Sequence, residues 1–246
     1  MTNWRFYLYI FFICFVILGA SLFSHYRQFY FENRENFDSG PVIDTTSSSS
    51  SSKKTIVLLG DSILKNNHYV GTGQSVEDLL NNQGSTSQKI VVLAKDDATI
   101  ATTYSQLDEI TSDLNTEKTS VFLSIGGNDI INAYSLQGND TVNPNVIHMI
   151  FYKYKQLVDA IRTKLPKVNI ILLDLYFPLK IDYTKYYRVI KIWNKMLVNY
   201  VPTSPNNITG IIKISDLLIH SSDFASDIEP SESGGKKIVD QIISMV

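Results

Sequence analysis

Five short apolar runs, separated by longer amphipathic stretches, constrain the fold of this chain more than any other feature. The runs are TIVLLG (55–60), KIVVLA (89–94), SVFLSIG (120–126), NIILLDL (169–175) and GIIKIS (210–215). They are apolar at nearly every position, which is typical of strands buried on both faces of a parallel sheet. The stretches 74–82, 145–164 and 183–200 have the spacing of amphipathic helices. The sequence therefore predicts an α/β fold, a three-layer α/β/α sandwich around a five-stranded parallel sheet.

The N-terminal region predicts a membrane attachment. The run from Phe6 to Phe23 holds 18 residues without a charge, which is the length that a helix needs to cross a bilayer. We interpret residues 1–23 as a transmembrane anchor; the alternative is a cleaved signal peptide with a mediocre site at Gly19 and Ser21. Because a short N-terminus usually stays in the cytosol, the rest of this single-pass protein is expected outside the cytoplasm.

Residues 24–54 contain the tract TTSSSSSSKK, which offers too little apolar surface to fold, so they predict a flexible linker. Residues 55–246 remain as one globular domain. The formal net charge of −2 gives no basic surface for phosphates, which argues against a nucleic-acid partner. The single cysteine, Cys14, lies in the apolar run, so no internal disulfide is possible.

Polar residues follow the predicted strands. In an open parallel sheet, sites form beyond the carboxyl ends of the strands. Gly60, Asp61 and Ser62 follow the first run, and the segment GGND (126–129) follows the third. A serine at a strand-to-helix turn can act as a nucleophile, with backbone N–H groups and the Asn128 amide stabilising an oxyanion. The structural alternative is that Ser62 is a helix N-cap and Asn128 a turn residue.

Two of these segments resemble blocks of a known family. LLGDSIL (58–64) and SIGGND (124–129) resemble the first and third blocks of the SGNH, or GDSL-like, hydrolases. The resemblance covers about 55–246 and implies a flavodoxin-like esterase or lipase fold without cofactor or metal. It implies Ser62 as nucleophile and oxyanion donor, with Gly126 and Asn128 at the oxyanion hole. The stretch GDSIL..N..YV and the closing DFASDIEPSESGGKKI are similar to a bacterial branch that ends in I-E-P-S, followed by G-G and a helix.

The chain departs from the family pattern at two blocks. In the second block, Asp97 stands where the family has a glycine that donates its N–H to the oxyanion. Its N–H remains available, but a carboxylate near a forming anion is repelled, so this side chain should point away. In the fifth block the family has Asp-x-x-His-Pro, whereas here Glu229 precedes Pro230 and Ser226 replaces the aspartate. The usual triad is therefore absent.

Two residues are candidates for the base that deprotonates Ser62. Glu229 has the position of the family's histidine, but a carboxylate is a weak base unless burial raises its pKa. His220 has a better-matched pKa but lies nine residues upstream of that position. Glu229 has a structural alternative, since a carboxylate at a helix N-terminus is a stabilising cap.

Two functions from different classes follow. The first is a membrane-tethered serine hydrolase with a degenerate triad, which acts on an acyl ester. The second is a catalytically silent hydrolase-like module that binds a glycan, a lipid or a partner protein. A phosphatase with Asp61 as nucleophile is a much weaker third hypothesis, because no metal-ligand cluster follows it in the sequence.

Overall fold

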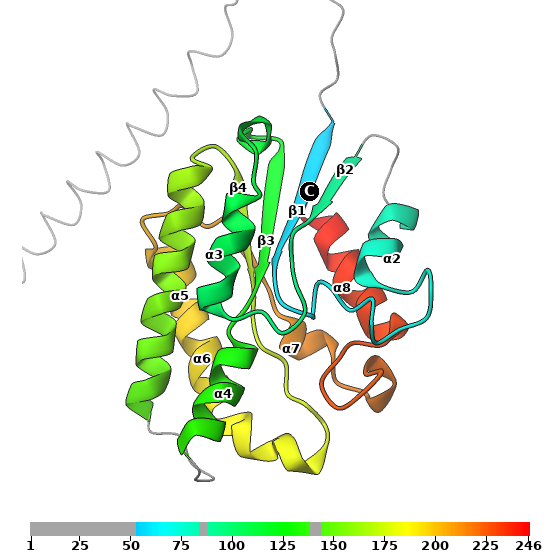
Figure 1. The fold of residues 1–246 in the computed structure, drawn as a ribbon, viewed down its shortest axis with the longest axis vertical. Helices are drawn as coiled ribbons and strands as arrows, with labels where there is room; N and C mark the ends of the chain where they lie inside the picture. The colour runs from blue at the N-terminus through cyan, green and yellow to red at the C-terminus, as the bar shows by residue number, and fades with distance from the viewer. Residues whose placement is uncertain (1–52, 84–87, 138–143) are drawn as a thin grey trace, which may run out of the picture. The chain divides into compact units, whose positions relative to one another are not determined.

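The computed structural model describes residues 53–83, 88–137 and 144–246. These residues form a parallel sheet between two layers of helices, as the sequence predicts (Figure 1). The predicted anchor (1–23) and nearly all of the predicted linker (24–54) lie outside the described residues. Within the described ranges, no helix is long and apolar enough to cross a membrane.

The sheet has five parallel strands. They are β1 (Lys54–Gly60), β2 (Gln88–Val92), β3 (Thr119–Ser124), β4 (Asn169–Leu173) and β5 (Gly210–Ile212), in the spatial order β2-β1-β3-β4-β5. This is the flavodoxin-like order, whose switch point lies at the carboxyl ends of β1 and β3. The resemblance predicted such a fold, and this part of the prediction is confirmed.

The last strand is shorter than the sequence indicates. Helix α7 (Ile214–Leu217) begins within the run GIIKIS. The reason is Asp174 at the end of β4, whose carboxylate accepts hydrogen bonds from the backbone N–H and the hydroxyl of Ser215. This contact satisfies a donor in the first turn of α7 and ends the strand.

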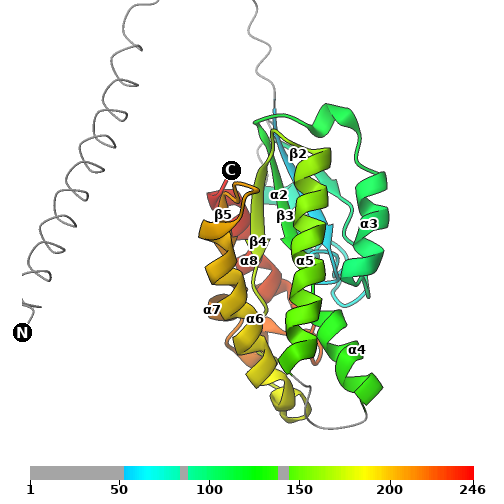
Figure 2. The same ribbon diagram turned by 90° about the vertical axis from the view of Figure 1, so that its left-hand side faces the viewer.

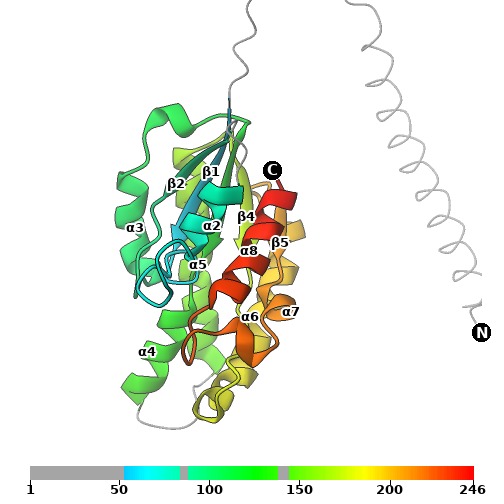
Figure 3. The same ribbon diagram turned by 90° about the vertical axis from the view of Figure 1, so that its right-hand side faces the viewer.

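Helices cover both faces of the sheet. Figures 2 and 3 show α3 (Ile100–Asp108), α5 (Pro144–Lys164) and α6 (Tyr187–Tyr200) on one face and α2 (Val76–Gln83) and α8 (Glu232–Ser244) on the other. Helix α4 (Gly127–Gln137) follows β3 directly. Short 3₁₀ turns occupy Ser112–Leu114, Ile181–Tyr186, Val201–Thr203 and Ser221–Asp223. The predicted helices at 74–82, 145–164 and 183–200 thus correspond to α2, α5 and α6.

Strand β1, which lies between β2 and β3, shows why its sequence is apolar throughout. Val57 and Leu59 pack in the cluster on the side of α3, α5 and α6, while Ile56 and Leu58 pack in the cluster on the side of α2 and α8. All four side chains are fully buried. Because successive side chains of a strand point to opposite faces, a strand covered on both faces favours apolar residues at nearly every position.

Candidate active site

The carboxyl end of β1 delivers Ser62 to the edge of the sheet. Gly60 has φ +123°, and a Cβ there would lie 1.7 Å from the Ser124 carbonyl oxygen, so only glycine allows β1 to end so close to β3. A tight turn follows, in which the Leu64 N–H donates to the Asp61 carbonyl at 3.1 Å. The expectation that Ser62 begins a helix was wrong, since the next helix, α2, begins at Val76. The turn instead buries Ser62, which is 7% exposed.

Ser62 contacts Glu229, which comes from the opposite end of the sequence. The Ser62 hydroxyl donates to Glu229 Oε1 at 3.0 Å, and both side chains are buried. The second oxygen, Glu229 Oε2, is buried and has no hydrogen-bond partner among the described residues. Ser226, which replaces the family's orienting aspartate, is exposed. A serine thus meets a carboxylate in a buried setting, and among the described residues Ser62 is the one side chain that hydrogen-bonds to that carboxylate.

A short hairpin-like loop holds Glu229 in place. Phe224 and Pro230 form an isolated antiparallel bridge, and the Ala225 N–H donates to the Glu229 carbonyl at 2.8 Å. The N-cap of α8 is Ser231, whose side chain accepts from the Gly234 N–H. The interpretation of Glu229 as a helix cap is therefore wrong, and its side chain faces Ser62 instead.

Two buried polar side chains tie this loop to the rest of the site. Asn66 is fully buried; its Nδ2 donates to the Pro230 carbonyl at 3.0 Å, and its Oδ1 accepts from the Val76 N–H at 2.9 Å. Asn66 therefore connects the segment after Ser62, the start of α2 and the residue next to Glu229. From the other side, the Tyr176 hydroxyl, just after β4, donates to the carbonyl of Ile228.

Burial changes the acidity of Glu229. Desolvation raises the pKa of Glu229 to about 7, and the negative charges of Asp96 and Asp97 act in the same direction. The hydrogen bond from Ser62 opposes this shift, because it stabilises the carboxylate. At neutral pH a large fraction of Glu229 is therefore ionised and basic enough to accept a proton.

Asp61, beside Ser62, has a similar environment. Desolvation raises the pKa of Asp61 to about 7, against the hydrogen bonds from Ser124 and Ile63, and the charge of Glu229 raises it further. The Ser124 hydroxyl and the Ile63 N–H both donate to Asp61 Oδ1, at 3.1 and 3.3 Å. Asp61 thus fixes the turn around Ser62 and is electrostatically coupled to Glu229.

The predicted oxyanion residues lie at the start of α4. Asn128 lines the same cavity as Ser62 and Glu229, and its Nδ2 donates to the Ala98 carbonyl at 2.9 Å. An amide nitrogen carries two hydrogens, so this bond orients the group and leaves one hydrogen for a ligand. Gly126 has φ +117°, and a Cβ there would lie 2.5 Å from the Trp193 ring, so conformation and packing both require glycine.

The backbone N–H of Asp97 does not point into the cavity as expected for an oxyanion donor. Its φ of +55° is left-handed, which explains why glycine suits this position and why aspartate is tolerated there. As expected, Asp97 is exposed. Its N–H, however, donates to Asp96 Oδ1 at 3.0 Å rather than into the cavity beside Ser62. The Asp96 carboxylate also accepts from the Tyr69 hydroxyl at 2.9 Å.

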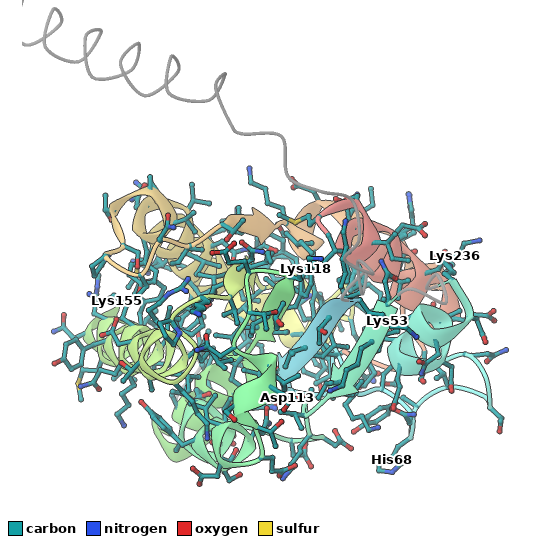
Figure 4. All side chains as sticks on the ribbon, turned by 90° about the horizontal axis from the view of Figure 1, so that it is seen from above. Lys53, His68, Asp113, Lys118, Lys155 and Lys236 are labelled. Carbon is teal, nitrogen blue, oxygen red and sulfur yellow. The ribbon has the colours of Figure 1, made fainter. Side chains whose placement is uncertain are left out.

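His220 is not among the residues that line the cavity containing Ser62. His220 is exposed at the start of the 3₁₀ turn Ser221–Asp223, and its backbone N–H donates to Asp223 Oδ2 at 2.9 Å. The Asp223 carboxylate is paired with Lys237 at 2.7 Å. His68 points outward at the edge of the domain (Figure 4), with a side chain that is 80% exposed. Of the two candidate residues, Glu229 is the one with a hydrogen bond to Ser62 in the described part of the chain.

The sequence interpretation missed three supporting residues, namely Asn66, Gln106 and Tyr176. Gln106 on α3 is fully buried and forms a reciprocal pair with Gly60, accepting from its N–H and donating to its carbonyl, both at 2.8 Å. The available signal was a polar residue on the apolar face of a helix, which indicates a satisfied buried group. Within the described ranges, no cluster of three or more His, Cys, Asp or Glu residues is placed to hold a metal ion.

Solved structures share this architecture, although no family model and no curated protein matches the sequence. A lipolytic protein of the G-D-S-L family from Veillonella parvula superimposes with a TM-score of 0.58 at 22% identity, over 77% of this chain and 96% of the other. The domain has the fold of the GDSL family. Phospholipase A1 from Streptomyces albidoflavus (TM-score 0.57, 14% identity) and an extracellular lipase from Streptomyces rimosus (TM-score 0.56, 16% identity) also match. They align with 79% and 78% of this chain and with 100% of each of those chains.

The resemblance seen in the sequence is therefore confirmed at the level of the fold. In this GDSL fold, the segments that carry Ser62, Asn128 and Glu229 meet at one cavity beyond the strand ends. At this cavity, Ser62 contacts a buried glutamate directly.

Proposed function

We propose that the domain is a serine ester hydrolase in which Ser62 is the nucleophile and Glu229 the general base. The observation that carries this proposal is the buried hydrogen bond of 3.0 Å from Ser62 Oγ to Glu229 Oε1. A hydroxyl is a weak nucleophile until an adjacent base removes its proton. Solved GDSL-fold proteins described as lipases and as a phospholipase support an ester as the substrate.

The acidity of Glu229 fits this role. A general base works best when its pKa is close to the working pH. An ordinary glutamate, with a pKa of about 4.3, accepts a proton from a hydroxyl poorly. Burial raises the pKa of Glu229 to about 7, so the carboxylate has the basicity that an imidazole has in other hydrolases.

The reaction then proceeds through an acyl-enzyme. Glu229 takes the Ser62 proton while Oγ bonds to the ester carbonyl carbon, and the carbonyl electron pair moves to its oxygen. The Asn128 amide and the Ser62 backbone N–H stabilise that oxyanion. When the intermediate collapses, the bond to the alcohol oxygen breaks and Glu229 returns its proton to that oxygen. Water, deprotonated by Glu229, releases the acid from Ser62 in the same way.

The test uses the full-length protein in detergent. Wild type should hydrolyse p-nitrophenyl acetate and react with a fluorophosphonate probe, and Ser62→Ala should abolish both. Ser105→Ala is the matched control, because Ser105 is an exposed serine on α3 that donates to the Thr102 carbonyl. Labelling that persists in Ser62→Ala would exclude Ser62 as nucleophile. A folded wild type without turnover would favour the binding module instead.

We also propose that residues 6–23 anchor the protein in a membrane, with the domain outside the cytoplasm. The support is the uncharged run of 18 residues and the serine tract that separates it from β1. After carbonate extraction, the protein should remain in the membrane fraction with its N-terminus intact. Recovery in the soluble fraction with a new N-terminus near Leu22 would show that the run is a cleaved signal.

A further inference from the structure

Two cavities, one mostly apolar and the other polar, are both lined by Asn128. The first cavity contains Ser62 and Glu229 and measures about 60 Å³. Its remaining walls are mostly apolar, including Ile130, Leu175 and Ile190. One buried water needs about 10–15 Å³ on this scale, so the space suits a chain of only a few heavy atoms.

The second cavity is larger, open and polar. It measures about 500 Å³ and is lined by Asp97, Asn132, Asp182, Lys185 and Asp227. We call these five residues the polar cleft. The two cavities share Asn128 and the wall residues Ile131, Tyr183, Tyr186 and Ile228.

This arrangement assigns the two halves of an ester to different places. The scissile carbonyl must lie between the Ser62 hydroxyl and the Asn128 amide, where the cavities join. The acyl chain then enters the small apolar cavity, because burying apolar surface there is favourable. The alcohol part extends into the polar cleft, which is open to solvent and offers hydrogen-bonding groups.

The charges of the polar cleft select among alcohols. Three carboxylates, from Asp97, Asp182 and Asp227, face one lysine, Lys185. Lys180 pairs with Asp227 at 2.6 Å and neutralises that one carboxylate. A net negative charge remains, and it repels an anionic group and attracts a cationic one.

Glu229 gives a second, independent indication of a ligand. Its side chain is only 5% exposed, and Oε2 has no hydrogen-bond partner among the described residues although it lines the small cavity. Buried carboxylate oxygens are rarely left without a donor. A hydrogen-bond donor of a bound ligand, or the water that releases the acyl group, would satisfy this oxygen.

We propose that the substrate is a short-chain acyl ester of a polar alcohol that is neutral or positively charged, and that Asp182 helps to exclude anionic alcohols. This inference rests on the proposed ester hydrolysis. Asp182 is exposed in the turn Ile181–Tyr186, so its side chain can be changed without disturbing the core.

The kinetic test compares kcat/KM for acetylcholine, monoacetylglycerol and acetylglycerol phosphate, whose alcohols are cationic, neutral and anionic. The first two should exceed the third by about tenfold at low ionic strength, and the ratio should shrink at 0.5 M salt, because exposed charges are screened. Asp182→Lys should reduce the ratio at least threefold. Asp108→Lys, an exposed acid on α3 outside both cavities, should leave it unchanged. Equal rates for all three esters would overturn the proposal, as would equal effects of the two variants.

Chain length gives a second comparison. The rate with p-nitrophenyl butyrate should exceed that with p-nitrophenyl dodecanoate by at least tenfold in the same detergent. A preference for the dodecanoate would overturn the short-chain assignment.

A binding measurement separates this inference from the proposed hydrolysis. NMR titration of Ser62→Ala with free choline and with glycerol 3-phosphate needs no turnover. Choline should bind more tightly than glycerol 3-phosphate, and Asp182→Lys in the same background should weaken choline binding. Tighter binding of glycerol 3-phosphate would overturn the inference even if wild type hydrolyses esters. Selective choline binding without hydrolysis by wild type would support the charge selectivity of the polar cleft and refute the proposed ester hydrolysis.

Discussion

Replacing Asn66 with alanine should reduce both stability and turnover, because Asn66 bonds two buried backbone groups at once. The change removes the donor to the Pro230 carbonyl at 3.0 Å and the acceptor for the Val76 N–H at 2.9 Å. Each buried polar group left without a partner costs about 1–3 kcal/mol. We therefore expect Asn66→Ala to lower the free energy of unfolding by about 2–5 kcal/mol, which corresponds to a decrease in Tm of roughly 5–15 °C.

Turnover should fall for a separate reason. Pro230 follows Glu229 directly, so losing the Asn66 bond removes one of the contacts that hold Glu229 against Ser62. A misplacement of about 1 Å at a reacting group can cost about 100-fold in rate. At a temperature where the variant is folded by circular dichroism, kcat for p-nitrophenyl acetate should fall about 10- to 100-fold, with KM nearly unchanged.

Asn206→Ala provides the matched control. Asn206 is a buried asparagine whose Nδ2 contacts Asp159 and Tyr200, and it precedes β5 at the other end of the sheet. Its loss should lower the unfolding free energy but leave kcat intact. A kcat for Asn66→Ala within twofold of wild type, together with a similar loss of stability, would refute the role of Asn66 in positioning Glu229.

Three further changes have defined outcomes. Gly126→Ala should lower the unfolding free energy by about 2–5 kcal/mol in urea denaturation, because its φ of +117° is strained for alanine and the new Cβ would meet Trp193 at 2.5 Å; an unchanged midpoint would contradict this packing. Asn128→Ala should lower kcat by about 100- to 1000-fold through loss of an oxyanion donor, and an undiminished rate would remove it from the mechanism. His220→Ala should leave the pH dependence of kcat/KM unchanged, because His220 is exposed and donates its backbone N–H to Asp223; a shifted profile would restore it as a base.

The sequence predicts the fold well because the fold depends on local pattern. In β1, uninterrupted apolar residues such as Val57 and Leu58 can be accommodated only by a strand that is covered on both faces. The end of β5 was less predictable, since Ile214 and Ser215 fit a strand until Asp174 caps the helix that they begin. That cap comes from a residue about forty positions away, which no local pattern reveals.

The sequence indicates which residues lie near the site, but not which of them form hydrogen bonds with one another. The blocks around Ser62 and Asn128 indicated which residues meet, because strand ends of a parallel sheet share one edge. Whether Glu229 or His220 contacts Ser62 depends on a loop that Asn66 and Tyr176 help to hold, each through a bond to a backbone carbonyl. Sequence spacing carries no information on such bonds, and the raised pKa of Glu229 follows only from its burial.

The most direct test of the account is the pH dependence of kcat/KM for wild type and Glu229→Gln. Because burial raises the pKa of Glu229 to about 7, the base is protonated and inactive below this value. Wild-type kcat/KM should therefore rise with pH and level off above an apparent pKa near 7, which reports Glu229 coupled to the neighbouring Asp61, Asp96 and Asp97. Glu229→Gln should fold normally, lose at least 100-fold in kcat/KM and show no such rise. Retention of wild-type kcat/KM by Glu229→Gln, with the same rise near pH 7, would contradict the assignment of Glu229 as the base for Ser62.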